Sequence, residues 1–264
     1  MDSKRIESPA QSILLARIWM NLGVRMQTFR STSKADRWNE HQRIVVHQYL
    51  EDRKRYRARV NRLIQTAESA QVEGMLFPAC ALVHGAGGLK RAGYCFPEKA
   101  FLVGGALNIG QRPNREYGLV VQSGSLIGTF TRHEIGHFAC KDLMILAAIS
   151  STIRRLWRFP DEAPKDFGGA EDRQPSRILL LDAGHHPYSD HYRRHTLRKA
   201  VETLHRRHIL PAAAVLSSWQ YLTSTPTPSW CMPPQAARVV ERMNIDGDLL
   251  DVVEINFRNE TMGQ

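Results

Sequence analysis

The side chains around Cys140 are of the types that a cysteine nucleophile needs. Arg132, His137 and Lys141 lie close to Cys140 in the sequence, and each can carry a positive charge. Nearby positive charge lowers the pKa of a thiol, and the thiolate is its reactive form. If the Cys140 thiol is reactive, these three side chains are therefore the candidate sources of the positive charge that it needs. The alternative is a small buried residue on a strand, a common place for a free cysteine.

A second pattern overlaps the first. Residues 133–137 read His-Glu-Ile-Gly-His, which matches H-E-x-x-H. On a helix this spacing places His133 and His137 on one face, where both imidazoles can bind zinc. Glu134 would then polarise the water that attacks the substrate. This pattern makes a zinc-dependent hydrolase the alternative function.

The zinc interpretation requires a third ligand and a helix. Residues 133–142 resemble the gluzincin metallopeptidases, and the resemblance implies a later acidic ligand, with Glu171 and Glu162 as the candidates. However, residues 126–131 lead into the motif with Thr-Phe-Thr, which favours a strand. Zinc is therefore the alternative cofactor, whereas the nucleophile interpretation requires none.

Apolar runs and turn residues indicate which elements position these side chains. Helical spacing of apolar residues predicts helices, and short apolar runs between turn residues predict strands. The expected helices cover residues 43–69, 143–157 and 191–207; the expected strands cover 24–29, 74–82, 100–107, 117–122, 126–132, 135–140, 177–183, 209–217, 237–243 and 249–257. Because strands 177–183 and 209–217 flank a helix, we expect them to pair in parallel. Residues 159–175 are expected to form a surface loop.

One α/β domain accounts for nearly the whole chain. We assign residues 21–258 to this domain, residues 1–20 to an N-terminal extension and residues 259–264 to a C-terminal tail. A chain of 264 residues is compatible with a single large sandwich or barrel.

The order of several short motifs resembles the nitrilase (carbon–nitrogen hydrolase) superfamily. The chain has Leu-Phe-Pro at 76–78, GSLIGTFTRH at 124–133, GHFACKDL at 136–143 and RILLLDAG at 177–184. The resemblance covers residues 20–258 and implies a four-layer α-β-β-α sandwich that commonly forms homodimers. It also implies a small amide or nitrile as the substrate, with Cys140 at the nucleophile position.

The other two catalytic positions of that family are altered in this chain. Ala79 stands where the family has a glutamate, and Arg132 stands where it has a lysine. Alanine cannot take the proton of the thiol, and arginine does not readily change its protonation state. Glu98 belongs to the one Phe-Pro-Glu in the sequence, at 96–98, but it lies too close to the strand at 100–107 to take the place of that glutamate. We therefore expect either a divergent hydrolase or a catalytically impaired relative.

Charge and hydropathy restrict the partners. The chain carries a formal net charge of +10, much of it in residues 53–62 and 193–207. Both runs also have apolar residues at helical spacing, so a solvated helix face is the first interpretation, and nucleic-acid binding remains open. No apolar run is long enough to cross a membrane, and the first residues lack a secretory signal pattern. The four widely spaced cysteines fit reduced thiols in the cytoplasm.

Overall fold

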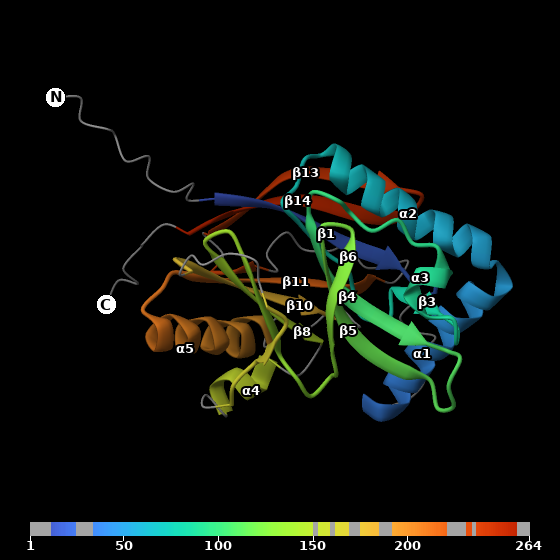
Figure 1. Cartoon of the computed structure of the whole chain (residues 1–264), viewed down its shortest axis with the longest axis horizontal. Coiled ribbons are helices and arrows are strands. Elements are labelled where there is room, and N and C mark those ends of the chain that lie inside the picture. The colour runs from blue at the N-terminus through green and yellow to red at the C-terminus, as the bar shows by residue number, and fades with distance from the viewer. Residues whose placement is uncertain are drawn as a thin grey trace.

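The computed structural model describes residues 12–24, 34–149, 153–158, 162–168, 175–184, 192–220, 231–233 and 236–257. The protein is a mixed α/β structure in which the strands join into one large sheet (Figure 1). The α/β class that the sequence predicts is therefore confirmed. None of the described helices is long and apolar enough to cross a membrane.

The first described strand begins earlier than the sequence indicates. Strand β1 (Ser12–Asn21) lies almost entirely in the segment assigned to an N-terminal extension. The strand expected at 24–29 falls outside the described residues except for its first position. Two helices follow, α1 (Lys34–Glu51) and α2 (Arg53–Ser69), where one was expected. They separate at Asp52, whose side chain accepts a hydrogen bond from the Arg55 N–H and so caps α2.

Most of the next elements lie where the sequence predicts strands. They are β2 (Gly74–Leu76), β3 (Leu82–His84), the short helix α3 (Gly88–Ala92), β4 (Phe101–Asn108), β5 (Arg115–Gln122) and β6 (Ser125–Phe130). The strand expected at 74–82 is interrupted by a turn. Ser123 and Gly124 both have positive φ and join β5 to β6 as the expected hairpin.

The helix expected at 143–157 is wrong in its first half. Strands β7 (Gly136–Cys140) and β8 (Leu143–Ile149) form an antiparallel hairpin, and only α4 (Ile153–Arg158) is helical. The residues of β8 are apolar on both faces, which suits a strand covered on both sides. Lys141, with φ of 55°, supplies the tight turn that the hairpin needs.

The remaining strands and helix complete the sheet. They are β9 (Lys165–Asp166), β10 (Arg177–Ala183), a π-helical turn η3 (Tyr192–Leu197) that continues into α5 (Arg198–His208), β11 (Ala212–Gln220), β12 (Cys231–Met232), β13 (Ala237–Ile245) and β14 (Asp248–Asn256). Strands β10 and β11 pair in parallel along six residue pairs, which confirms the strand–helix–strand prediction.

The strand order places β1 at the centre. The sheet runs β6-β5-β4-β2-β1-β11-β10-β8-β7-β9, and β1 also pairs with β14. Strands β4, β2, β1, β11, β10 and β8 are mutually parallel along this path. Their carboxyl ends therefore lie at the same edge of the sheet.

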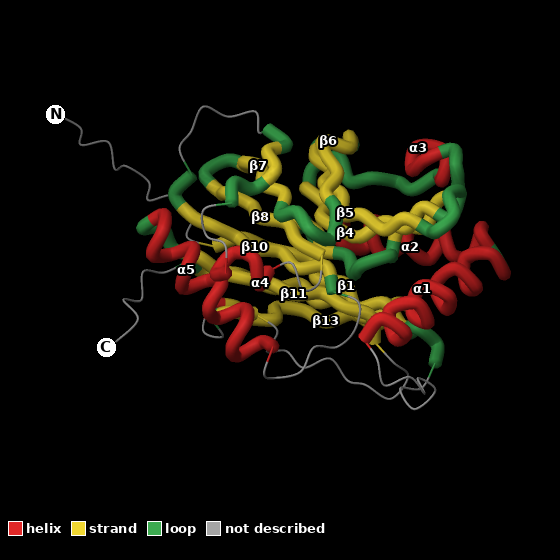
Figure 2. Tube along the Cα trace, turned by 90° about the horizontal axis from the view of Figure 1, so that it is seen from below, coloured by secondary structure: helices red, strands yellow, loops and turns green. Residues whose placement is uncertain are grey.

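Buried apolar side chains form three groups. One group packs α1 and α2 against β1, β2 and β4; a second lies between the strands of the first half and β7, β8, β10 and β11; a third packs α4 and α5 against β8, β10 and β11. The two pairs of helices thus cover different sides of the strands (Figure 2). Because apolar side chains fill the space on both faces of the strands, a polar site is expected at the strand ends.

Candidate functional site

The carboxyl ends of the parallel strands bring several polar residues to one edge. Cys80 follows β2, and Asp182 lies near the end of β10. Strand β5 is antiparallel to β4, so Glu116 near its start lies at the same edge. Strand β6 is antiparallel to β5, so Arg132 just after its end lies there too. Ligands of open α/β sheets bind outside the carboxyl ends of the strands, which makes this edge the candidate site.

A tight turn positions Cys80. The Ala81 N–H donates to the Pro78 carbonyl at 3.4 Å, and Cys80, the third residue of the turn, has φ of 60°. A positive φ at this position is typical of a type II turn and unfavourable for a residue with a Cβ. The conformation is imposed by the surrounding structure rather than by Cys80.

Long-range hydrogen bonds hold this turn from two sides. The Ala79 N–H donates to the Gly184 carbonyl at 3.0 Å, and Trp219 Nε1 donates to the Ala79 carbonyl at 2.6 Å. Gly105 passes so close that a Cβ there would lie 2.4 Å from the Ala79 Cα. The position that the nitrilase resemblance gives to a glutamate is thus a rigid, buried piece of backbone.

The thiol of Cys80 contacts a carboxyl group. Cys80 Sγ donates to Glu116 Oε1 at 3.3 Å. Burial raises the pKa of the Cys80 thiol well above its ordinary value, and the nearby Glu116 carboxylate adds to this effect. Burial also raises the pKa of Glu116 to about 8, although the Cys80 hydrogen bond and the charge of Arg132 oppose it. At neutral pH Glu116 is therefore mostly protonated.

Glu116 lines a wide cavity with a positively charged wall. The cavity has a volume of about 910 Å³. Its lining is Gln42, Arg43, Gln111, Arg112, Pro113, Asn114, Arg115, Glu116, Thr131, Arg132 and His133. Four of these side chains are arginines, and the one carboxyl group among them is mostly neutral. Such a wall attracts anions and can pair with a carboxylate through its guanidinium groups.

Arg132, which the sequence analysis singles out beside Cys140, lines this cavity. It lies in the connection between β6 and β7, and its Nε donates to His133 Nε2 at 3.2 Å. The same connection is closed by Glu134, whose carboxylate accepts from the Thr131 N–H at 2.7 Å. This hydrogen bond lowers the pKa of Glu134. Glu134 therefore stabilises the loop that carries Arg132.

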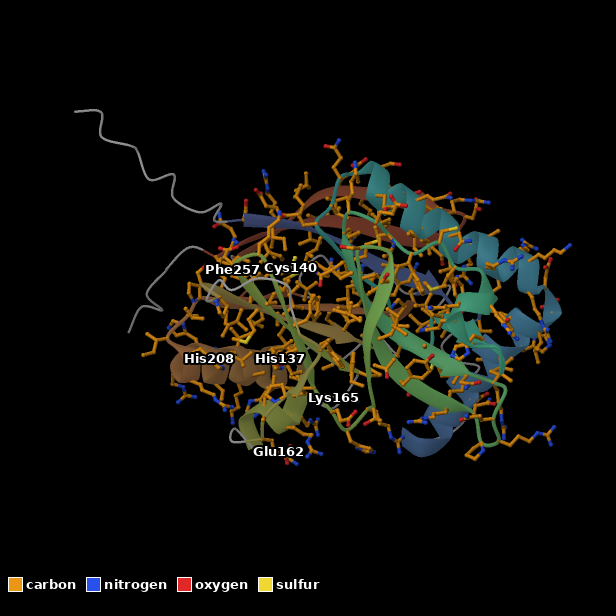
Figure 3. The ribbon with its side chains drawn as sticks, in the orientation of Figure 1. His137, Cys140, Glu162, Lys165, His208 and Phe257 are labelled. Atoms are coloured by element: carbon orange, nitrogen blue, oxygen red, sulfur yellow. The ribbon has the colours of Figure 1, made fainter. Side chains whose placement is uncertain are left out.

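Cys140 lies away from Arg132 and Ala79. It is the last residue of β7, and it pairs with Leu143 across the hairpin turn, whereas Arg132 precedes the first residue of that strand. A strand of this length separates its ends by about 13 Å. Figure 3 shows Cys140 well apart from His137, which lies near the other end of β7. The structure does not bring the two expected catalytic residues together.

The cause is the hairpin that replaces the expected helix after Cys140. A helix was expected directly after Cys140. In the structure the helix, α4, follows β8 rather than β7. The end of β8, at Ile149, lies at the same edge as Arg132 because β8 is antiparallel to β7. Cys140 instead neighbours the ion pair of Lys141 with Glu73, at 3.4 Å.

The H-E-x-x-H residues do not lie on a helix. His133 and Glu134 are in the loop before β7, and His137 is on the strand itself, 3.4 Å from Asp166 Oδ1. Glu162 is paired with Arg155, and Glu171 lies outside the described residues. Within the described part of the chain, no group of three His, Cys, Asp or Glu side chains is arranged to hold a metal ion. The helical geometry on which the zinc interpretation depends is therefore absent at 133–137.

Cys80 and Glu116 were not among the residues singled out from the sequence. Cys80 comes directly after Ala79, where the nitrilase resemblance leads one to expect a glutamate, and this is the one local signal that could have indicated it. Glu116 has no such signal, because it reaches Cys80 only through the pairing of β4 with β5.

Comparisons with known proteins add little to this geometry. No family model matches the chain, and no curated protein matches it. Among solved structures, it is similar to a glutamine-dependent NAD(+) synthetase from Cytophaga hutchinsonii, with 12% identity and a TM-score of 0.39 over 79% of this chain. The match covers 36% of the synthetase chain. A similarity of this size assigns neither a family nor an activity.

Proposed function

We propose that this chain is a divergent carbon–nitrogen hydrolase-like protein that binds a small, negatively charged amide in the cavity beside Glu116 and Arg132. The order of the nitrilase-like motifs supports the family. The two helix pairs on different sides of the strands support the four-layer sandwich that the family implies.

The charge of the cavity carries the proposal. Arg112, Arg115 and Arg132 can bind a carboxylate of the ligand, because guanidinium groups pair with carboxylates through parallel hydrogen bonds. Glu116, held protonated by its surroundings, can donate a hydrogen bond to an amide carbonyl. A ligand that combines both groups would use both features of the cavity.

The placement of the thiols favours binding without cysteine-based hydrolysis. Cys140 lies at the far end of β7, and Cys80 is buried with a raised pKa. A nucleophilic thiol needs a lowered pKa and access to the substrate. In this proposal Cys80 is a positioning residue for Glu116, and the protein is a ligand-binding relative of the hydrolases.

A binding experiment tests the proposal. Calorimetry with succinamate, the monoamide of a dicarboxylic acid, should detect binding, whereas the neutral diamide succinamide should bind at least about tenfold more weakly. Arg132→Gln should weaken succinamate binding by a similar factor. Arg238→Gln is the matched control, because Arg238 is exposed on β13 and pairs with Glu254. Affinity should fall as the pH rises through about 8, when Glu116 ionises.

Three results would overturn the proposal. The first is that the protein binds no acidic amide, simple acid or nitrile. The second is release of ammonia from an amide at a rate that Cys140→Ala abolishes, which would restore Cys140 as a nucleophile. The third is succinamate binding that neither Arg132→Gln nor Glu116→Gln changes, which would place the ligand outside this cavity.

A further inference from the structure

Helices α2 and α3 carry a second positively charged surface that does not line the cavity. We call it the α2–α3 basic surface; it consists of Arg53, Lys54, Arg55 and Arg57 on α2 and of Lys90 and Arg91 on α3. Five of the six side chains are exposed, and Arg57 is half-exposed. Arg57 Nη1 donates to the Ala92 carbonyl at 3.4 Å, which joins the two helices into one surface.

The cations of this surface are not neutralised by described residues. Further along α2, Arg59 pairs with Asp248, and Arg62 pairs with Asp246. None of the six side chains of the α2–α3 basic surface forms an ion pair with any residue that the structure describes. Arg59 and Arg62 of α2 are therefore ion-paired with described residues, whereas the basic residues before them on the helix are not.

Helix stability does not account for these charges. Arg53, Lys54 and Arg55 occupy the first turn of α2, which contains no acidic residue. The positive end of the helix dipole lies there, so cations at this end are unfavourable. The basic residues of α5 contrast with them, because they occupy the last turn, where the dipole favours cations. The basic end of α5 therefore has a structural explanation that α2 lacks.

The chemistry of the surface fits a phosphodiester backbone. Four of its six cations are arginines, whose planar guanidinium groups bind phosphate oxygens in pairs. The apolar side chains of α2, including Tyr56, Val60 and Leu63, are buried against the sheet. A helix that inserts into a lipid surface needs an exposed apolar face, and α2 has none among its described residues.

We infer that the α2–α3 basic surface binds the phosphate backbone of a nucleic-acid strand. The interaction is electrostatic and independent of base sequence, because phosphate contacts carry no sequence information, and the nearby Tyr49 ring is half-buried with the Arg53 guanidinium 5.8 Å from its centroid. The backbone N–H groups of α2 are not needed for it, since Asp52 already caps the helix.

Fluorescence anisotropy with labelled oligonucleotides of about 20 nucleotides tests the inference. The full chain should bind at low salt, and its affinity should fall steeply as salt is added. The variant Arg53→Gln/Lys54→Gln/Arg55→Gln should bind at least about tenfold more weakly, with a shallower salt dependence. Lys90→Gln/Arg91→Gln should weaken binding independently, which guards against a folding defect in the first variant. The control Arg198→Gln/Arg206→Gln/Arg207→Gln removes the same charge from α5 and should bind like the wild type.

Three outcomes would overturn the inference. The first is no binding of single strands or duplexes by the wild-type chain at low salt. The second is equal weakening in the α5 control, which would make the effect one of net charge alone. The third is binding to phosphatidylserine vesicles, lost in the α2 variant, without oligonucleotide binding. None of these outcomes bears on the cavity, because its ligand is tested separately with succinamate.

Discussion

The thiol of Cys80 donates to the Glu116 carboxyl at 3.3 Å, so the two groups share a hydrogen bond within a largely buried site. Burial raises the pKa of both groups, that of Glu116 to about 8. Both therefore hold their protons at neutral pH. The protonated Glu116 therefore adds no negative charge to the arginine-lined wall of the cavity.

The replacement Glu116→Gln should change how the free energy of unfolding depends on pH, because it removes the carboxyl group whose pKa is raised. The unfolded chain releases the Glu116 proton near its ordinary pKa of 4.5, whereas the folded chain holds it until about pH 8. Between these values the unfolded state binds fewer protons, so the free energy of unfolding falls as the pH rises. Because water partly screens this group, the loss is about 2 kcal/mol.

Glutamine does not titrate, so the variant should gain stability relative to the wild type from about pH 5 to about pH 8 and hold that gain above it. Urea unfolding at several pH values measures the difference. Glu98→Gln serves as the control, because it removes an exposed carboxylate. A difference that is the same at every pH would contradict a raised pKa at Glu116.

The four cysteines should differ in their reactivity with iodoacetamide. Cys95 is exposed and should be labelled first, and the half-buried Cys140 should follow. Cys80 and Cys231 are buried, and burial raises the pKa of both thiols, so they should react only when the chain unfolds. Mass spectrometry of digested, time-quenched samples gives the order. Labelling of Cys140 ahead of Cys95 would mean that its thiol is activated, in favour of a nucleophilic role.

Gly105→Ala should destabilise the turn that carries Cys80. The added Cβ would lie 2.4 Å from the Ala79 Cα and 2.7 Å from the Cys80 nitrogen, which are backbone atoms held by other hydrogen bonds. We expect a loss of about 3 kcal/mol, the upper range for overpacking in a rigid core. Gly85→Ala is the matched control, since nothing lies within 4 Å of a Cβ there. Equal unfolding midpoints for the two variants would show that the turn can move.

The buried ion pair of Arg17 and Asp251 should be costly to break. Their side chains are fully buried and 2.8 Å apart, and Trp19 Nε1 also donates to Asp251. Asp251→Asn would leave the Arg17 charge buried without compensation, for a loss of about 3–5 kcal/mol. The exposed pair of Arg238 and Glu254 supplies the control, because Glu254→Gln should cost less than about 1 kcal/mol.

The same network should make the protein sensitive to acid. Burial alone would raise the pKa of Asp251, but hydrogen bonds and charge from Arg242 and Arg17 lower it overall. The stability that Asp251 contributes is present above the ordinary pKa of an aspartate and is lost as the pH falls through the lowered value. The Asp251→Asn variant should show a weaker fall in thermal stability on acidification. An unchanged acid profile would exclude Asp251 as its source.

Local patterns in the sequence were enough to predict many strands. Residues 178–181 form an unbroken apolar run of Ile and Leu, and they lie in the buried strand β10. Strands β4, β5 and β6 also lie near the predicted ranges. In these segments the local preference agrees with the tertiary environment.

The errors arose where distant contacts determine the structure. Residues 143–149 have helix-compatible residues, yet pairing with β7 and β10 makes them a strand. Strand β1 contains Arg17, a residue that rarely occurs inside a core, and its burial depends on an ion pair with Asp251, far along the chain. The contact between Cys80 and Glu116 likewise depends on strand pairing that no local pattern encodes.

The central position of β1 has a consequence for how the protein forms during synthesis. Its antiparallel partner is β14, the last described strand, and they pair from Ser12 to Trp19. Contacts between such distant segments close slowly, because a long loop must be ordered before they form. The ribosome must therefore release nearly all of the described chain before β14 can pair with β1, and until then the backbone edge of β1 that β14 covers stays accessible to chaperones.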